Sequence, residues 1–304
     1  PPPAARTGPP TTPWSGMAPE LDAALTQIDG WEVPHAAAVV CGPDGVLARR
    51  GEVARRQRVA SVTKVATALA VWVATEEEAV GLDEPAGPEG STVRHLLAHA
   101  SGLAFDRPVA LASPGARRIY SNVGFDLLGD LVAERTGIAF ADYLQEAVLA
   151  PLAMDASALE GSPAKDLWST ANDLARLAVE LLRPTLVAPE TRALATSVAF
   201  PGLAGVLPGV GAFDPNDWGL GVEIKGAKHP HWAGRATAPT TFGHFGGAGT
   251  FLWVDPSREL ACLGLSGREF GPWAMAAWPP LADLVVAAHD AARRAARGAS
   301  SPPG

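Results

Sequence analysis

Ser61 and Lys64 stand three residues apart in the stretch ASVTKVATALA, where a polar segment turns into an apolar run. A serine hydroxyl is a weak nucleophile and needs a nearby base. Residues three apart lie on the same face of a helix, and burial there would lower the lysine pKa until its amine can accept the serine proton. The stretch therefore predicts either an acyl-transfer nucleophile with its base, or simply a helix that begins with a capping serine.

The same spacing recurs at Ser162 and Lys165, in the stretch LEGSPAKDLW. This segment resembles a loop, so we expect Lys165 to be exposed and fully charged. A charged lysine is a poor base. We interpret this second pair as a chance match.

Tyr120 and Asn122 follow a Pro–Gly turn and immediately precede a helical pattern, and Tyr120 is one of only two tyrosines in the chain. Side chains on a loop at a helix start can point into a cleft, which makes both residues candidates for an active site. The alternatives are a half-buried aromatic ring with a hydrogen-bonded hydroxyl for Tyr120 and a helix N-cap for Asn122.

His244 precedes Gly246 and Gly247 in the stretch TFGHFGGAGTFLWVD, at the edge of an apolar strand. Glycines at such an edge let a substrate approach the backbone closely and pair with it. A lone histidine is more often structural than catalytic, but one followed by glycines at the start of a strand is a candidate binding residue.

The elements that must position these residues are strands at both ends of the chain around a helical middle. Alternating and apolar runs predict two strands joined by a turn at 42–45 and further strands after 215. Helical spacing predicts helices over 61–79, 92–102, 121–137, 139–152, 169–182 and 281–295. The pattern predicts an α/β (α+β) fold, with one antiparallel sheet assembled from both chain ends, flanked by helices and carrying a mostly helical insertion.

The predicted domain spans 17–296, with an α/β part at about 17–80 and 215–296 and a helical part at about 81–214. Residues 1–16 and 297–304 are rich in Pro, Gly, Ser, Thr, Ala or Arg and are predicted to be disordered tails. No signal peptide, membrane span or metal-ligand spacing is evident, so a cytoplasmic protein is the default expectation.

Composition narrows the partners further. The 304 residues carry a net charge of −8, which argues against nucleic acid or an anionic membrane as the main partner. Cys41 and Cys262 each lie in an apolar, strand-like run. Buried free thiols are expected, although a single bridge between neighbouring strands is possible.

Three short motifs, taken in order, resemble those of the penicillin-recognising serine hydrolases, a family that includes β-lactamases and penicillin-binding proteins. They are Ser61-Val62-Thr63-Lys64, Tyr120-Ser121-Asn122 and His244-Phe245-Gly246. The Y-x-N and H-x-G forms are similar to the class C branch, which also contains D-alanyl-D-alanine carboxypeptidases, D-amino-acid peptidases and esterases. The resemblance extends over about residues 35–265, nearly the whole predicted domain.

This resemblance implies a β-lactamase/transpeptidase-like fold and a serine hydrolase that works through an acyl-enzyme. Ser61 would be the nucleophile, Lys64 its base or proton relay, and Tyr120 a partner in proton transfer. Asn122 would hold the amide carbonyl of the substrate and His244 would line the pocket. The N–H groups of Ser61 and Gly247 would form the oxyanion hole.

The implied substrate is a small amide or ester, such as a D-amino-acid peptide, an ester or a β-lactam-like compound, and no metal or organic cofactor is implied. An acyltransferase on the same fold and a non-catalytic penicillin-binding-like module remain alternatives. The third motif of the family often carries a lysine that attracts a substrate carboxylate, but here it is His244, expected to be half protonated only near pH ~6.5. We therefore hypothesise that β-lactams are poor substrates. Arg268 could supply the missing charge, although a surface position is expected for it.

Overall fold

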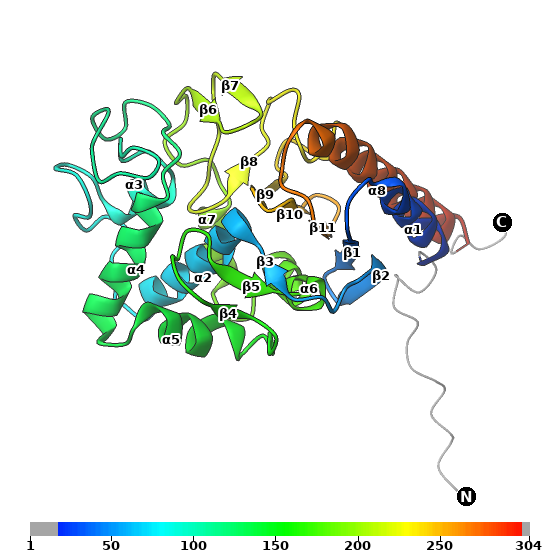
Figure 1. The fold of residues 1–304 in the computed structure, drawn as a ribbon, viewed down its shortest axis with the longest axis horizontal. Coiled ribbons are helices and arrows are strands. Elements are labelled where there is room, and N and C mark those ends of the chain that lie inside the picture. Colours follow the sequence, from blue (N-terminus) through cyan, green and yellow to red (C-terminus); the bar gives the residue numbers. More distant parts are fainter. Residues whose placement is uncertain (1–17, 300–304) are drawn as a thin grey trace, which may run out of the picture.

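A six-stranded antiparallel sheet is the centre of the computed structural model, which describes residues 18–299 (Figure 1). Its strands run in the order β2-β1-β11-β10-β9-β8. They are β1 (Ala36–Gly42), β2 (Gly45–Gly51), β8 (Glu223–Ile224), β9 (Phe242–Gly246), β10 (Thr250–Asp255) and β11 (Leu260–Ser266). Because β1 pairs with β11, the prediction of a sheet assembled from both chain ends is confirmed.

Helices cover both faces of this sheet. On one face, α1 (Ala18–Leu25) and α8 (Pro272–Ala299) lie side by side (Figure 1). On the other face, α6 (Ala171–Leu182) packs against β1 and β11, although it comes from the middle of the chain. The sheet is therefore buried between helices from three distant parts of the sequence.

Cys41 and Cys262 point to opposite faces of the sheet. Val40 is the residue that pairs with Cys262 across β1 and β11, and successive side chains along a strand alternate between faces. The Cys41 thiol lies 3.8 Å from the Ala175 carbonyl of α6, whereas Cys262 belongs to the core beneath α1 and α8. Both thiols are buried and free, as expected, and the alternation explains why neighbouring strands do not bring them together.

The middle of the chain is mostly helical, as predicted. Besides α6 it contains α2 (Thr63–Glu76), α3 (Val93–Leu97), α4 (Val123–Thr136), α5 (Phe140–Leu144) and α7 (Pro189–Ala195). Single turns of 3₁₀ or π-helix occur at η1 (Thr26–Gly30), η2 (Ala60–Val62) and η3 (Gln145–Leu149). Sequence patterns missed the short strands β3 (Gln57–Arg58), β4 (Ala158–Leu159), β5 (Leu167–Ser169), β6 (Gly205–Leu207) and β7 (Gly211–Phe213), which are too short to show alternation.

Several helix boundaries differ from the prediction, and two of them differ most. The helix expected over 92–102 ends at Leu97, because His99 takes φ +53°, a left-handed conformation that no right-handed helix accommodates. The closing helix expected over 281–295 begins earlier, at Pro272, and runs through Pro279 and Pro280. Burial of its apolar face against the sheet outweighs the local cost of these prolines.

The predicted tails fall largely outside the described residues. Helix α8 continues to Ala299 and so includes 297–299 of the predicted C-terminal tail. The segments 1–16 and 300–304 lie outside the described part of the chain. Within 18–299, no helix is both long and apolar enough to cross a membrane, and no cluster of His, Cys, Asp or Glu side chains is placed to hold a metal ion.

Helix α2 belongs to the core that also contains α6, and a glycine lets the loop at 219–221 approach the helix closely. Gly221 has φ +97°, and a Cβ built on it would overlap the Cβ of Ala68 in α2. Next to it, the Leu220 carbonyl accepts a 3.0 Å hydrogen bond from the Trp72 indole. The loop is thereby held directly against the helix that carries Lys64.

We expect Gly221→Ala to lower the free energy of unfolding by at least about 2 kcal/mol, because alanine is strained at this φ and has no room beside Ala68. Urea unfolding would measure the loss. Gly30→Ala is the matched control, since a Cβ there meets nothing within 4 Å. Equal stability of the two variants would contradict this account of the α2 packing.

Candidate active site

Ser61 lies in the 3₁₀ turn that leads into α2, and it lines a cavity of about 260 Å³. The residue before it, Ala60, takes φ +46°, an unfavourable conformation for a residue with a Cβ. The capping interpretation is wrong, because Val62 occupies the N-cap position of α2 and Ser61 lies one residue further out. The local backbone instead presents the Ser61 hydroxyl to the cavity.

Lys64 is completely buried, with an exposed fraction of 0%. Its Nζ lies 2.7 Å from Asn122 Oδ1, 2.8 Å from the Ala164 carbonyl and 3.4 Å from Ser61 Oγ. Burial lowers the pKa of Lys64 well below its ordinary value, and no carboxylate within 18–299 forms a salt bridge with it to restore that value. The neutral amine is therefore strongly favoured relative to an exposed lysine.

Tyr120 lines the same cavity as Ser61. The Lys64 Nζ is 4.8 Å from the centre of the Tyr120 ring. Burial raises the pKa of Tyr120, so its hydroxyl keeps its proton at neutral pH. Ser61 is thus flanked by an amine whose pKa is lowered and a phenol whose pKa is raised.

His99 fixes the backbone on both sides of Tyr120. The His99 carbonyl accepts a 2.9 Å hydrogen bond from the N–H of Ile119, and its Nδ1 accepts a 3.1 Å bond from the N–H of Ser121. Its ring packs on the Tyr120 ring with centroids 4.4 Å apart. The left-handed backbone of His99 that ends α3 therefore also positions the tyrosine.

His244 lies on β9, with its Nε2 3.4 Å from the Tyr120 hydroxyl. Its Nδ1 is 2.6 Å from the Phe245 carbonyl, which can only accept, so Nδ1 carries the proton and Nε2 is the acceptor for Tyr120. Burial, reinforced by Lys64, lowers the pKa of His244 to about 3. The expectation of half protonation near pH ~6.5 is therefore wrong, and His244 is neutral at physiological pH.

Asn122 occupies the N-cap position of α4, but its side chain caps nothing and instead accepts the hydrogen bond from Lys64. The glycines after His244 lie beside the nucleophile. A Cβ on Gly246 would collide with the Val59 carbonyl and come within 3.1 Å of the Ser61 nitrogen, so only glycine fits there. Gly247 lines the same cavity as Ser61.

The second Ser-Lys pair does not form a site. Lys165 is exposed, as expected, and it does not line the cavity. The segment nevertheless contributes a backbone group, since the Ala164 carbonyl accepts one of the Lys64 hydrogen bonds. A main-chain carbonyl has no residue-type signature, so the sequence could not reveal this contribution.

The remaining walls of the cavity are mostly apolar and come from loops that the sequence did not single out. They are Phe105, Leu207, Pro208, Gly209, Phe245 and Phe270. Arg268, considered as a source of positive charge, is exposed and packs over Trp273, and it does not line the cavity. The cavity is therefore enclosed by aromatic and aliphatic side chains and contains no permanently charged group in its wall.

Behind His244 lies a buried ion pair between Glu223 and Lys228, with side chains 1% exposed and 3.1 Å between Oε1 and Nζ. Lys228 also donates to the carbonyl of Asp217, the residue before Trp218. The Trp218 ring packs against the rings of both Tyr120 and His244. The ion pair therefore anchors the segment that supports the aromatic floor of the site.

A second buried cation, Arg118, ties the loops on the other flank. Its guanidinium donates only to backbone carbonyls, which belong to Ala98, Ala199, Phe200 and Asn216. Burial lowers the pKa of Arg118 to about 10, which leaves it charged at neutral pH. Arg118 stands two residues before Tyr120 in the sequence, and its hydrogen bonds join the segments that follow α3 and α7.

The sheet built from both chain ends, with its helical insertion, is a β-lactamase/transpeptidase-like fold, and comparison with known proteins gives the family. The family model described as Beta-lactamase matches residues 29–287. The chain belongs to this family. No curated protein sequence matches it.

Among solved structures, the chain is similar to a β-lactamase from Mycobacterium bovis, with 53% identity over 88% of this chain and 99% of that one, and a TM-score of 0.87. Two more distant structures share the fold. The LovD9 mutant of simvastatin synthase from Aspergillus terreus is 17% identical over 92% of this chain and 100% of its own, with a TM-score of 0.72. EstCE1, a hydrolase with promiscuous acyltransferase activity, is 16% identical over 90% and 99%, also with a TM-score of 0.72.

We expect Glu223→Gln to destabilise the fold by about 3–5 kcal/mol at neutral pH, because it leaves Lys228 buried without its counter-charge. Burial raises the pKa of Glu223, but Lys228 and the bonds from His231 and Trp232 outweigh it and lower the pKa from 4.5 to about 2. The stabilisation is therefore complete above pH 4.5 and is lost as the pH falls toward 2.

Chemical denaturation at pH 7 and at several values between pH 4.5 and 2 would test this expectation. The difference in the free energy of unfolding between wild type and Glu223→Gln should decrease as the pH falls from 4.5 to 2. Glu52→Gln, in an exposed pair with Arg55, is the control and should cost less than about 1 kcal/mol. A Glu223→Gln variant as stable as this control would contradict the anchoring role.

Proposed function

We propose that the protein is a serine hydrolase that cleaves an uncharged ester or amide through an acyl-enzyme on Ser61. The observation that carries the proposal is the hydrogen-bond arrangement around Lys64. A neutral amine has two N–H donors and one lone pair. The two shortest contacts, Asn122 Oδ1 and the Ala164 carbonyl, are acceptors that use both donors, which leaves the lone pair for the Ser61 hydroxyl.

Acylation begins when Ser61 Oγ attacks the substrate carbonyl carbon and its proton passes to the lone pair of Lys64. The carbonyl oxygen becomes an oxyanion, for which the N–H groups of Ser61 and Gly247 would be the donors. The bond to the leaving group then breaks, and that group takes a proton, for which the protonated Tyr120 hydroxyl is suited. Water then attacks the resulting serine ester and gives a proton to the deprotonated Tyr120 oxygen. Ser61 Oγ leaves and takes back the proton held by Lys64, so that the acid is released and all three side chains return to their starting forms.

The directions of the two pKa shifts support these roles. A base must be neutral before the reaction, and burial lowers the pKa of Lys64 in that direction. A proton donor must be protonated, and burial raises the pKa of Tyr120 in that direction. Groups whose environments push their pKa values apart are suited to opposite roles, so Lys64 is the base and Tyr120 the acid of the acylation step.

The cavity favours a substrate without a carboxylate. The wall residue in the third motif is His244, which is neutral because burial lowers its pKa to about 3. Arg268 does not reach the cavity, and most of the other walls are apolar. A β-lactam carboxylate would have to leave water without gaining a counter-charge, which costs free energy. An aryl or alkyl ester has no carboxylate and therefore avoids this cost.

The first test of this mechanism asks whether Lys64 is the base that activates Ser61. We expect Ser61→Ala to abolish labelling by a fluorophosphonate probe and Lys64→Met to reduce the labelling rate and kcat/KM for an aryl ester by about 100-fold or more. Arg235→Met removes one positive charge from an exposed position outside the Ser61 cavity and should react like wild type. Undiminished reactivity of Lys64→Met would refute the assignment, and absence of any Ser61-dependent label in wild type would favour the non-catalytic module.

The second test compares a substrate that carries a carboxylate with one that does not. Steady-state kinetics should give a higher kcat/KM for a short-chain aryl ester than for a chromogenic cephalosporin that carries a carboxylate. Because a His244 with a pKa of about 3 stays neutral, lowering the pH from 8 to 5 should not improve cephalosporin turnover relative to the ester. The substrate proposal would be contradicted if the cephalosporin had the higher kcat/KM. It would also be contradicted if kcat/KM for the cephalosporin rose relative to that for the ester as the pH falls, which a protonated histidine would require.

A further inference from the structure

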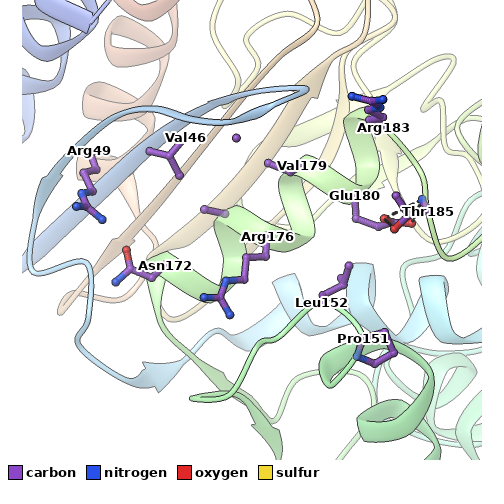
Figure 2. A pocket seen from close by; sticks show the side chains of 12 residues that line it. Val46, Arg49, Pro151, Leu152, Asn172, Arg176, Val179, Glu180, Arg183 and Thr185 are labelled. Atoms are coloured by element: carbon purple, nitrogen blue, oxygen red, sulfur yellow. Dashed lines mark hydrogen bonds between the residues drawn. The ribbon is translucent and has the colours of Figure 1, made fainter. Parts of the chain in front are cut away.

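A second cavity, of about 580 Å³, lies apart from the site described above and shares no lining residue with the Ser61 cavity. It is formed between the edge strand β2 and helix α6, with the loop at Pro151 and Leu152 closing one side (Figure 2). Arg49 of β2 pairs with Val39 of β1, whose side chain belongs to the core beneath α6. Arg49 therefore projects from the sheet face that α6 covers.

Nitrogen donors gather at one end of this cavity. Figure 2 shows Arg49 on the strand, and Asn172 and Arg176 on α6, at the end opposite Arg183 and Thr185. Within residues 18–299, neither Arg49 nor Arg176 has a carboxylate in salt-bridge distance, whereas Arg183 is paired with Asp44 at 3.2 Å. In a chain with a net charge of −8, two arginines with no ion-pair partner line one concave surface.

The carboxylate in the cavity wall does not serve these arginines. Glu180 is 3% exposed, and its two oxygens accept hydrogen bonds from the N–H groups of Thr185 and Leu186 and from the Thr185 hydroxyl. Its acceptor positions are thus directed into its own loop. Glu180 therefore does not occupy the guanidinium N–H donors of Arg49 and Arg176, which can bind a ligand.

The other wall of the cavity is apolar. Val46 has an exposed fraction of 49%, one of the larger exposed apolar side chains, and it faces Val179 and Leu152 across the cavity (Figure 2). An apolar wall next to two guanidinium groups suits a ligand that has an anionic head and an apolar body. A guanidinium binds a carboxylate through two parallel hydrogen bonds, which adds geometric selectivity to charge.

We propose that this cavity binds a small organic carboxylate, with the carboxylate held by Arg49 and Arg176 and assisted by the Asn172 amide, and with its apolar body against Val46 and Val179. The site is independent of the Ser61 chemistry, because none of its residues touches that cavity. Binding should weaken as the salt concentration rises, since the arginines are at the surface.

The test is a titration of the ¹⁵N-labelled Ser61→Ala protein with benzoate and with benzamide, a neutral molecule of nearly the same shape, followed by NMR. Benzoate should shift the amide signals of Val46, Arg176 and Val179 in a saturable way, and benzamide should not. The Arg49→Gln/Arg176→Gln variant should bind benzoate at least about tenfold more weakly, because it loses the charge-assisted hydrogen bonds of both guanidinium groups.

Arg117→Gln/Arg235→Gln is the matched control, since it removes the same charge from two exposed arginines outside this cavity and should leave benzoate affinity unchanged. Unchanged dispersion of the NMR spectrum and, with Ser61 restored, unchanged ester hydrolysis would show that Arg49→Gln/Arg176→Gln is folded. The proposal is overturned if benzamide binds as well as benzoate, if both double variants lose affinity equally, or if the benzoate shifts map to Phe105 and Phe270 in the Ser61 cavity.

Discussion

A fully buried lysine without a carboxylate partner is the constraint on which the site depends. An ammonium group at this depth is costly, and the fold lowers that cost by supplying neutral acceptors. Asn122 comes from the start of α4 and Ala164 from the loop before β5, so three segments distant in the chain must meet at the Nζ of Lys64. Helix α2 has to be buried for this to happen, and the close approach of Gly221 to Ala68 helps to bury it.

The same burial gives the neighbours of Ser61 their opposite character. Removing water from a lysine favours its neutral form, and removing water from a tyrosine also favours its neutral form. For Lys64 the neutral form is a base, and for Tyr120 it is an acid. The exclusion of water by Phe125, Trp218 and the surrounding loops is therefore the main cause of both pKa shifts.

The motif residues could be found from the sequence because their side-chain types carry chemistry, and the structure brings Ser61, Lys64, Tyr120, Asn122 and His244 to one place. The sheet from both chain ends was equally predictable, since long apolar strands leave a clear pattern. Backbone contributions could not be predicted, because the Ala164 carbonyl and the left-handed turn at His99 have no signature in residue type. The apolar wall residues of the Ser61 cavity were also missed, since a phenylalanine such as Phe270 in a loop has no periodicity to mark it.

The placement of charge explains the character of the cavity. Buried charges do occur nearby, but the fold keeps them behind the walls, with Glu223 and Lys228 neutralising each other beyond Trp218. Arg118 likewise directs all its donors to backbone carbonyls rather than to the cavity. The permanent charges therefore hold the loops in place while the reacting space remains neutral. In the proposed mechanism, the charge that develops on the oxyanion would be stabilised by backbone N–H groups and by Lys64 once it holds the Ser61 proton. Under that proposal, selection among substrates would rest on shape and on the absence of charge.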